Sequence, residues 1–366
     1  MAIGSQPSAL IPIPADATHG GGAPDGTLDF SVSLNPLGPP PAVFEAYGAA
    51  ADAIANYPAP YASRLTAAIA RWAGVEAVNV LVGNGSTQLI HLLARTLEAP
   101  AMHVVIPTFS EIANAIAIAG KVAYPITLDE HDFTLTEEKI ATSLARQAGP
   151  VFIGRPNSPT GSMLSLAQAN VIVRLCRRFN VYCVFDEAFI DFVEDGKSCA
   201  SILRSLPNLV VLRSLTKIFS IAGLRLGFVI AAEPIVTTMR ARLEPWSVNA
   251  IAERVALACL EDAGEFIARS QALVSRERMR IETRLRALGL RVIPSAANFL
   301  MVDLRRDEGG ISTADGFISF MMSRGIFVRD LRRLPGCVAG MFRVGIRTPA
   351  DNDVLLGAIE AWIKTR

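Results

Sequence analysis

Four short segments of the chain combine turn-forming residues with side chains that bind anions or react. They read GNGST at 83–87, RPNSPTG at 155–161, VFDEAFIDF at 184–192 and RSLTKIFSIAGLRLG at 213–227. In the last segment, Lys217 follows an apolar run and precedes Gly223 and Arg225. Lysine is usually a solvated surface charge, but in an apolar loop its pKa falls and the neutral amine attacks carbonyl groups. The segment therefore offers either a surface cation or a nucleophile.

Two of the other segments place polar groups beside apolar runs. Asp186 ends such a run, where a carboxylate is costly unless it meets a cation or a hydrogen-bond donor. In GNGST, glycines free the backbone to turn, and Ser86 and Thr87 open an amphipathic pattern. Exposed N–H groups at a helix start bind phosphate, although a glycine followed by a capping serine also begins many ordinary helices. A phosphate site and an ordinary helix start both remain open for this segment.

Short apolar runs alternate along the chain with longer amphipathic patterns. The runs lie at 78–84, 102–107, 151–155, 181–189, 209–215 and 224–231. Such runs between helices are typical of a largely parallel sheet with helices on both faces, so we expect an α/β fold. The strands of such a sheet end at the usual ligand crevice. The four segments lie at the ends of these runs, so the sheet would bring their side chains together.

The length of 366 residues favours two domains, or one large domain with an appendage. Residues 247–288 read as nearly continuous helix, ended by Gly289, and this helix is a suitable connector. Beyond it, short apolar runs and two helical patterns indicate a smaller α+β domain. We therefore expect an N-terminal segment or lid at 1–40, a large domain at 41–265 and a small C-terminal domain at 266–366.

The composition argues against several classes of protein. Hydrophobic residues make up 51% of the chain and charged residues 19%, with a net charge of +1. These values disfavour disorder and a polyanion-binding surface formed by bulk charge. No uncharged apolar stretch of about 18 residues and no secretory signal pattern occurs, so we expect a soluble, unexported, cytoplasmic protein. Five scattered cysteines without a C-x-x-C pair, and only four histidines, suggest neither a disulfide framework nor a metal site.

The order and spacing of the four segments resemble those of the pyridoxal-phosphate enzymes of the aspartate-aminotransferase fold, over essentially the whole chain. Within that superfamily the chain looks most like the L-threonine-O-3-phosphate decarboxylases of cobalamin biosynthesis, whose nearest relatives are the histidinol-phosphate aminotransferases. This resemblance rests on THGG (18–21), LDFSVSLNPLG (28–38), YPAPY (57–61), DEAFIDF, RSLTKIFSIAGLRLG, PWSVNA (245–250) and FRVGIR (342–347). It implies a PLP-dependent transferase fold of type I: a mainly parallel seven-stranded sheet sandwiched by helices, with a smaller α+β C-terminal domain.

The same resemblance implies pyridoxal 5'-phosphate as the cofactor and a catalytic pair. Lys217 would form an imine with the cofactor aldehyde, and an imine is a better partner for a substrate amine than a free aldehyde. Asp186 would keep the pyridine nitrogen protonated, so that the ring accepts electrons left at Cα. The other implied cofactor contacts are Gly85, Ser86, Thr87, Ser214 and Arg225 at the phosphate, Phe109 against the ring, and Tyr57 from a neighbouring subunit. A homodimer with shared active sites is therefore expected.

For the substrate, the resemblance implies two arginines. Arg343 matches an arginine that receives a carboxylate or phosphate, and Arg329 matches a second anion-binding arginine of the phosphate-handling subgroup. Two guanidinium groups suit a small phosphorylated amino acid; the alternative is that they pair surface carboxylates. His19 and Asn35 fall in segments that close over the substrate in relatives, so we expect them to contact it.

Two positions depart from the superfamily pattern. Where most members have asparagine before the proline of NPTG, donating to the phenolic oxygen of the cofactor, this chain has Ser158, preceded by Asn157. The serine donates instead, or Asn157 shifts in, or the imine pKa differs. Phe189 stands where the aminotransferases have a tyrosine hydroxyl on the same oxygen. We expect an altered imine pKa; an ordinary aminotransferase-like pH titration of the cofactor's absorbance would contradict it.

The resemblance implies PLP-dependent decarboxylation of L-threonine O-3-phosphate to (R)-1-amino-2-propanol O-2-phosphate. If the Cα–H bond rather than the carboxylate bond stands perpendicular to the cofactor ring, Lys217 takes that proton and the same residues run transamination. An aminotransferase of the histidinol-phosphate type is therefore the alternative, although DEAF, THGG and PWSVN favour the decarboxylase. A cofactor-binding protein without activity is a third hypothesis, disfavoured because no DNA-binding appendage is visible and the charge is near neutral.

Overall fold

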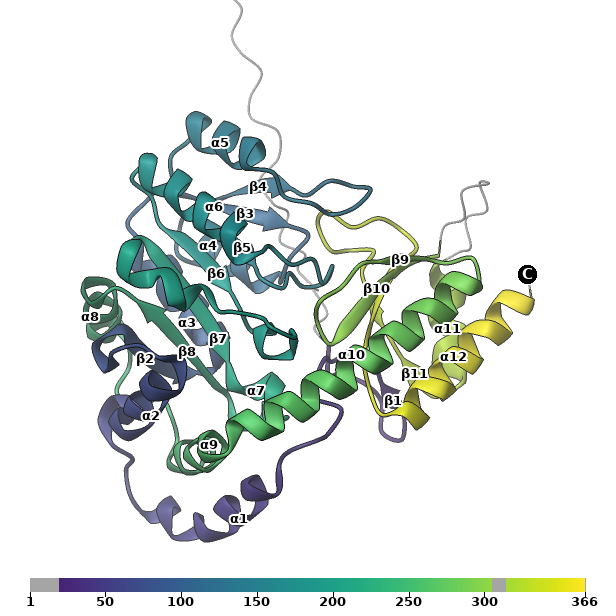
Figure 1. The fold of residues 1–366 in the computed structure, drawn as a ribbon, viewed down its shortest axis with the longest axis horizontal. Coiled ribbons are helices and arrows are strands. Elements are labelled where there is room, and N and C mark those ends of the chain that lie inside the picture. The colour runs from purple at the N-terminus through teal and green to yellow at the C-terminus, as the bar shows by residue number, and fades with distance from the viewer. Residues whose placement is uncertain (1–19, 305–313, 366) are drawn as a thin grey trace, which may run out of the picture.

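The computed structural model of the protein describes residues 20–304 and 314–365 (Figure 1). Its larger part is built around a seven-stranded sheet of order β2-β8-β7-β6-β5-β3-β4. In this order the strands are Val80–Asn84, Leu226–Ala231, Leu209–Ser214, Cys183–Asp186, Val151–Gly154, Ala101–Ile106 and Val122–Thr127. In this sheet β8 runs in the direction opposite to that of the other six strands. The prediction of a mainly parallel seven-stranded sheet is confirmed.

Helices cover both faces of this sheet. One apolar core holds residues of α3 (Gly85–Thr96), α4 (Glu111–Ile118) and α8 (Glu233–Arg242). The core on the other face holds residues of α1 (Pro41–Ala49), α2 (Ser63–Ala73), α5 (Glu137–Arg146), α6 (Leu166–Arg178), α7 (Leu215–Ile218) and α9 (Ala250–Glu261). The α/β layering expected from the alternating pattern is therefore present (Figure 1).

Strand β8 shows why its sequence is apolar without interruption. Phe228 and Ile230 enter one core, whereas Val229 and Ala231 enter the other. Successive side chains of a strand point to opposite faces, so a strand covered on both faces needs apolar residues at every position. All six residues of β8 are buried.

Local capping groups fix where several helices begin. At α6, the Ser165 hydroxyl accepts from the Gln168 backbone N–H and the Gln168 side chain accepts from the Ser165 backbone, which forms a capping box. Thr136 caps α5 in the same way through the Lys139 N–H, and Asn249 caps α9 through Ala252. These short-range hydrogen bonds fix the first residue of each helix. The hydrophobic pattern alone locates that residue only to within about one turn.

The smaller part of the molecule has its own sheet and core. Four antiparallel strands are ordered β12-β13-β10-β9. Their bounds are Arg329–Asp330, Met341–Gly345, Phe299–Asp303 and Arg291–Ile293, and α11 (Ala314–Ser323) and α12 (Pro349–Lys364) accompany them. From the N-terminal segment, β1 (Leu28–Asp29) pairs in parallel with β11 (Ile326–Phe327). The smaller α+β unit expected at the C-terminus is therefore present, and it includes a strand from near the N-terminus.

The helix expected to be nearly continuous over 247–288 is divided in two. It breaks at Asp262, where φ is −118° and ψ is 29°, between α9 and α10 (Ala263–Ala287). Gly289 follows the end of α10 with a φ of +77°, as the capping pattern predicted. α10 runs from the large sheet to the small one and links the two parts (Figure 1).

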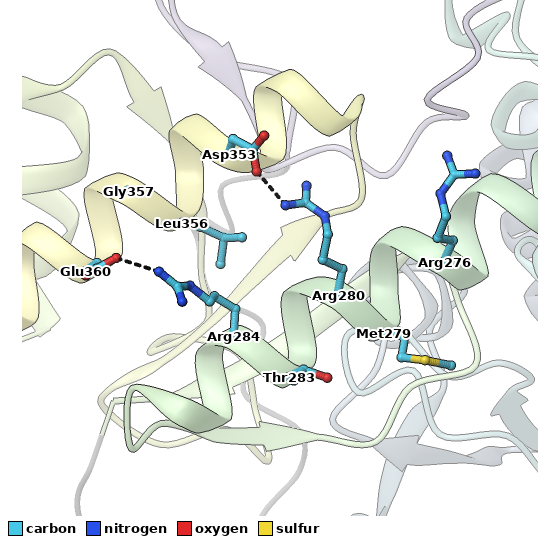
Figure 2. Close-up of a pocket in the computed structure, with 9 residues that line it drawn as sticks. All are labelled: Arg276, Met279, Arg280, Thr283, Arg284, Asp353, Leu356, Gly357 and Glu360. Atoms are coloured by element: carbon cyan, nitrogen blue, oxygen red, sulfur yellow. Dashed lines mark hydrogen bonds and ion pairs between the residues drawn. The ribbon is translucent and has the colours of Figure 1, made fainter.

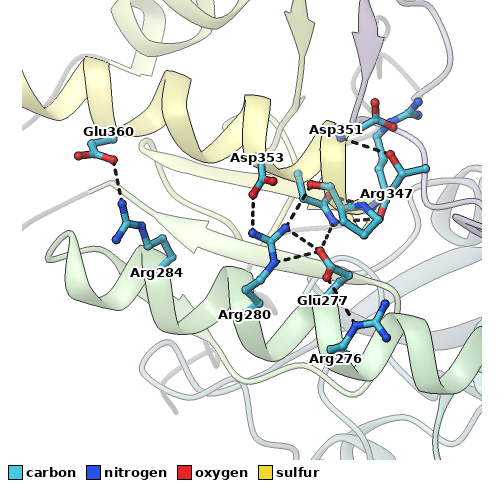
Figure 3. A network of polar contacts seen from close by, with 11 residues as sticks. Arg276, Glu277, Arg280, Arg284, Arg347, Asp351, Asp353 and Glu360 are labelled. Atoms are coloured by element: carbon cyan, nitrogen blue, oxygen red, sulfur yellow. Dashed lines mark hydrogen bonds and ion pairs between the residues drawn. The ribbon is translucent and has the colours of Figure 1, made fainter.

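A polar network fastens α10 to α12 (Figure 3). The buried carboxylate of Glu277 accepts hydrogen bonds from Arg280 and Asn352, at 2.7 Å and 3.0 Å. Arg280 also pairs with Asp353, and Arg284 pairs with Glu360. Since Glu277 has two donors, its burial is compensated.

Neither a membrane span nor a metal cluster is found in the described part of the chain. None of its helices has the length and apolar character needed to cross a bilayer. Its His, Cys, Asp and Glu side chains form no group of three or more that could hold a metal ion.

Candidate active site

A cavity of about 300 Å³ lies where the parallel strands end and the small sheet faces them. Residues that follow β2, β3, β5, β6 and β7 reach it, because carboxyl ends of parallel strands meet at one edge. Of the residues expected at the site, those that line the cavity are Gly85, Ser86, Thr87, Phe109, Ser158, Asp186, Ser214, Lys217, Arg225, Arg329 and Arg343. The fold thus assembles residues that are more than 250 positions apart in the sequence.

One end of the cavity is a cradle at the start of α3. Gly85 has a φ of +76°, and a Cβ there would lie 2.7 Å from Nη2 of Arg225. A Cβ on Gly227 would lie 2.5 Å from the backbone nitrogen of Ser86. Both positions therefore require glycine, and they bring a guanidinium group against the open N–H groups of a twelve-residue helix. This arrangement suits a phosphate group.

Lys217 and Asp186 lie deeper in the cavity, after β7 and at the end of β6. The pKa of Lys217 is lowered to about 8, mainly by burial and also by repulsion from Arg343 and Arg225, while the charge of Asp186 opposes the shift. Burial raises the pKa of Asp186 to about 6, against a hydrogen bond from the Ala188 N–H and the charge of Lys217. The shift of Lys217 favours the neutral amine that a nucleophile needs.

This shift predicts a pH dependence for attachment of an aldehyde cofactor to Lys217. Below its pKa of about 8 the amine is protonated and cannot attack, so the rate should rise about tenfold per pH unit up to that value and then level off. Mixing cofactor-free protein with pyridoxal phosphate between about pH 6 and pH 10, and following the absorbance, measures this rate. A rate that does not change across this range would contradict the assignment of Lys217.

The other end of the cavity carries two adjacent arginines. Arg329 on β12 and Arg343 on β13 are register partners. Arg343 donates through Nη1 to the Ser158 hydroxyl at 2.8 Å and through Nη2 to the Ser31 carbonyl at 2.7 Å. The pKa of Arg343 is lowered to about 10, mainly by burial and also by repulsion from Arg329, while the charge of Asp29 opposes the shift. Two neighbouring cations in a partly buried site favour an anion between them.

In the described part of the chain, neither arginine has a carboxylate partner within ion-pair distance. Nε of Arg343 is buried without a hydrogen-bond acceptor there. The alternative that these arginines pair surface carboxylates is therefore disfavoured. Four cations (Lys217, Arg225, Arg329, Arg343) and one carboxylate (Asp186) line the cavity among the described residues, so anionic ligands are needed to balance its charge.

Among the described residues, three of the expected site residues do not line this cavity: Asn157, Tyr57 and Asn35. Asn157 is buried, and its amide donates to the Pro107 carbonyl and to Thr160, so the structure does not support its expected cofactor contact. Tyr57 is 86% exposed on the surface. His19 lies outside the described residues.

Asn35 is buried beneath the Lys217 segment. Its Nδ2 donates to the Ile218 carbonyl and to the Ser270 hydroxyl, both at 2.7 Å, and its backbone N–H donates to the Lys217 carbonyl. Because its amide is fully used by protein groups, the predicted substrate contact is corrected. Asn35 holds the segment that carries Lys217.

Sequence reasoning missed two serines of the N-terminal segment. Ser31 and Ser33 line the cavity, and the buried hydroxyl of Ser33 has no hydrogen-bond partner in the described structure. The alternation of hydroxyl and apolar residues in FSVS was the available signal. Phe189 lines the cavity and packs edge-on against Phe299. Ser158 accepts from Arg343, so the imine pKa change expected from Ser158 and Phe189 stays a prediction.

A larger hollow of about 710 Å³ lies between α10 and α12 (Figure 2). Met279, Leu356 and Gly357 lie between its charged side chains. Its Arg280 and Arg284 are each paired with a carboxylate of α12. Because these ion pairs join α10 to α12, the charged side chains of the groove have a structural role.

The sheet, the cradle for phosphate, the buried lysine and the carboxylate on the neighbouring strand define a pyridoxal 5'-phosphate enzyme of fold type I. Residues 25–359 match the family described as "Aminotransferase class I and II", and the chain belongs to that family.

Relatives of two activities resemble the chain. It is 33% identical over 348 residues to the threonine-phosphate decarboxylase of Salmonella typhimurium, covering 94% of this chain and 93% of that protein. It is 30% identical over 334 residues to the histidinol-phosphate aminotransferase of Rhodospirillum centenum, covering 90% and 89%. Among solved structures, histidinol-phosphate aminotransferase from Sinorhizobium meliloti in complex with pyridoxal-5'-phosphate superposes with a TM-score of 0.81, 23% identity and coverage of 91% and 90%.

Proposed function

We propose that the protein decarboxylates L-threonine O-3-phosphate to (R)-1-amino-2-propanol O-2-phosphate, a step of cobalamin biosynthesis. The pair of adjacent arginines carries this proposal. Arg329 and Arg343 lie beside Lys217 in one cavity and lack carboxylate partners in the described structure. A substrate with one carboxylate and one phosphate supplies an anion for each of them. The similarity to a threonine-phosphate decarboxylase supports the same substrate class.

The cradle at the start of α3 would hold the cofactor phosphate. The N–H groups of Gly85, Ser86 and Thr87 and the guanidinium of Arg225 surround the space that both glycines leave open. Ser214, whose hydroxyl is bonded to Thr216 at 2.7 Å, lines the same cavity. Bound pyridoxal phosphate supplies an electron sink for the electron pair left at the substrate Cα.

Lys217 would bind the cofactor through its neutral amine and afterwards move protons at Cα. Asp186 would keep the ring nitrogen protonated. The positive charge on that nitrogen would make the ring a stronger electron acceptor. Arg329 and Arg343 would bind the carboxylate and the phosphate of the substrate and so set which bond at Cα is presented for cleavage. Loss of carbon dioxide would leave an electron pair at Cα, and a proton delivered there would complete the reaction. Orientation by the two arginines thereby selects the reaction.

The alternative activity is transamination of histidinol phosphate or a related compound. The named relatives include histidinol-phosphate aminotransferases at similar identity. Lys217, Asp186 and the phosphate cradle would serve both reactions. The two reactions differ in which bond at Cα is cleaved. Assays with the two substrates therefore distinguish decarboxylation from transamination.

We further propose that the protein is a homodimer with shared active sites. Five large side chains are exposed on α1, on the segment that follows it and on the loop before α9, and we call these five residues the aromatic face: Phe44, Tyr47, Ile54, Tyr57 and Trp246. Exposed apolar groups that lie close together mark contact surfaces. A second copy would cover this face and receive Tyr57 at its cofactor phosphate.

The test of the proposed reaction is incubation of the cofactor-loaded protein with L-threonine O-3-phosphate and no keto acid. We expect carbon dioxide to be lost over many turnovers, and mass spectrometry of the substrate and product measures it. If carbon dioxide is retained and the cofactor accumulates in its amine form, the chain is an aminotransferase. Supplying histidinol phosphate and a keto acid then checks that outcome.

A further inference from the structure

Tyr57 does not stand alone on the aromatic face. Its ring lies 5.3 Å from the ring of Trp246, centroid to centroid, with an angle of 45° between the planes. Tyr57 is 86% exposed and Trp246 is 47% exposed. Slightly more than half of Trp246 is therefore covered although it lies on the surface, and one of its contacts is the phenol ring. The pair joins two segments that are 189 positions apart in the chain.

The backbone of Trp246 is held in an unusual conformation. Its φ is +60°, in the left-handed region that bulky residues avoid. Such a conformation persists only where the surrounding structure determines it, and it is commonest at functional positions. The local sequence has proline before the tryptophan and no glycine from 244 to 249. The loop therefore keeps its shape against a steric preference.

Hydrogen bonds hold both ends of the loop formed by residues 244–249. At one end, Gln88 donates to the Glu244 carboxylate at 3.2 Å, and the Gln88 side-chain oxygen accepts from the Asn84 N–H at 2.7 Å. Asn84 immediately precedes the cradle for phosphate. At the other end, Asn249 caps α9. The loop 244–249 therefore connects the aromatic pair to the start of α3 in its own subunit.

We propose that Trp246 is a positioning residue for Tyr57. Its indole ring packs against the phenol ring and holds it outward, so that the hydroxyl enters the active site of a second copy and binds the cofactor phosphate there. This inference rests on the proposed homodimer and not on the reaction catalysed. A tyrosine that is 86% exposed has many rotamers available, and fixing it before association lowers the entropic cost of the contact. The aromatic pair supplies that restraint.

The experiment measures cofactor affinity in cofactor-free protein to which pyridoxal phosphate is returned. Trp246→Ala is expected to weaken binding about tenfold, the effect of losing a hydrogen bond to a charged group. Trp246→Phe keeps a ring and should restore affinity to within about threefold. Met279→Ala, which removes an exposed side chain of α10, is the matched control and should change nothing.

Two comparisons separate positioning from general packing. In a Tyr57→Phe background, Trp246→Ala should have little further effect, because both changes act on the same hydroxyl. With pyridoxal, which lacks the phosphate, Trp246→Ala should leave affinity unchanged. An equal loss in the Tyr57→Phe background, or an equal loss with pyridoxal, overturns the proposal. Should Trp246→Ala fail to fold, Trp246→Leu takes its place in both comparisons.

Sedimentation of the same samples separates this inference from its premise. A dimer is expected for the wild type and for each variant. A monomer that binds pyridoxal phosphate fully would overturn the homodimer and with it the role of Trp246. The reaction assay with L-threonine O-3-phosphate is read separately, so its failure leaves the affinity measurements unaffected.

Discussion

Replacing Lys217 with alanine is expected to reduce turnover about 10,000-fold, the upper range for losing a group that transfers protons, with the covalent attachment lost as well. Burial of the amine lowers the pKa of Lys217 to about 8, so the surroundings disfavour the ammonium form. Removing it should therefore leave the fold intact. Steady-state turnover measures the loss, and thermal unfolding checks the fold.

Covalent attachment gives a second readout for Lys217→Ala. Treatment with borohydride should fix the cofactor to the wild type, and mass spectrometry of the peptide containing Lys217 should show the added mass. No such adduct is expected in the variant. Lys364→Ala, at an exposed position in α12, is the control and should behave as the wild type. Turnover within tenfold of the wild type, or unchanged biological function, would favour a cofactor-binding protein without activity.

Replacing Asp186 with asparagine should lower kcat about 1000-fold, comparable to removing one preorganised charge-stabilising group. The amide has the same shape, but it carries no charge to hold a proton on the ring nitrogen. Burial raises the pKa of Asp186 to about 6 in the cofactor-free protein, so near neutral pH the carboxyl is ionised. The variant should still attach the cofactor to Lys217, and single-turnover kinetics should show the loss in the chemical step.

The matched control is Asp353→Asn, which changes an exposed carboxyl of α12 far from the cavity. Its kcat should equal that of the wild type. In the wild type, cofactor affinity should fall as the pH is lowered through about 6, because the carboxyl of Asp186 then becomes neutral. A normal kcat in the Asp186→Asn variant would show that this carboxyl does not control the protonation of the cofactor's ring nitrogen.

The fold class could be predicted because the hydrophobic period reports burial. In β8, Phe228 and Val229 face opposite cores, so the run is apolar throughout, and only a sheet covered on both faces requires that. The position of Lys217 and Asp186 at strand ends then followed, since parallel strands end at one edge. The apolar pattern of a strand and the residues at its end are local features, so a short segment of sequence is enough to recognise them.

Contacts between distant segments could not be predicted in this way. Arg343 bonds the Ser158 hydroxyl and the Ser31 carbonyl, across 185 and 312 positions. Asn35 bonds the Lys217 segment instead of facing the cavity, because the N-terminal chain passes under that segment. The helix breaks at Asp262, which is neither glycine nor proline, so the residue type there did not predict the break. Each of these depends on how separate elements are placed in space.

The roles of Lys217 as nucleophile, of Asp186 as its partner carboxylate and of the glycine-rich segment as a phosphate site are implied by the resemblance and stay predictions. The sequence by itself determined the layered fold and the placement of these residues at strand ends. Each depends on residue type and on periodicity along one element. Only the tertiary structure decided that Asn157 is absent from the cavity lining, that Ser33 is part of it, and that the ring of Trp246 lies against the ring of Tyr57. Side-chain direction and exposure at these positions are set by neighbours from other parts of the chain, and spacing in the sequence does not encode them.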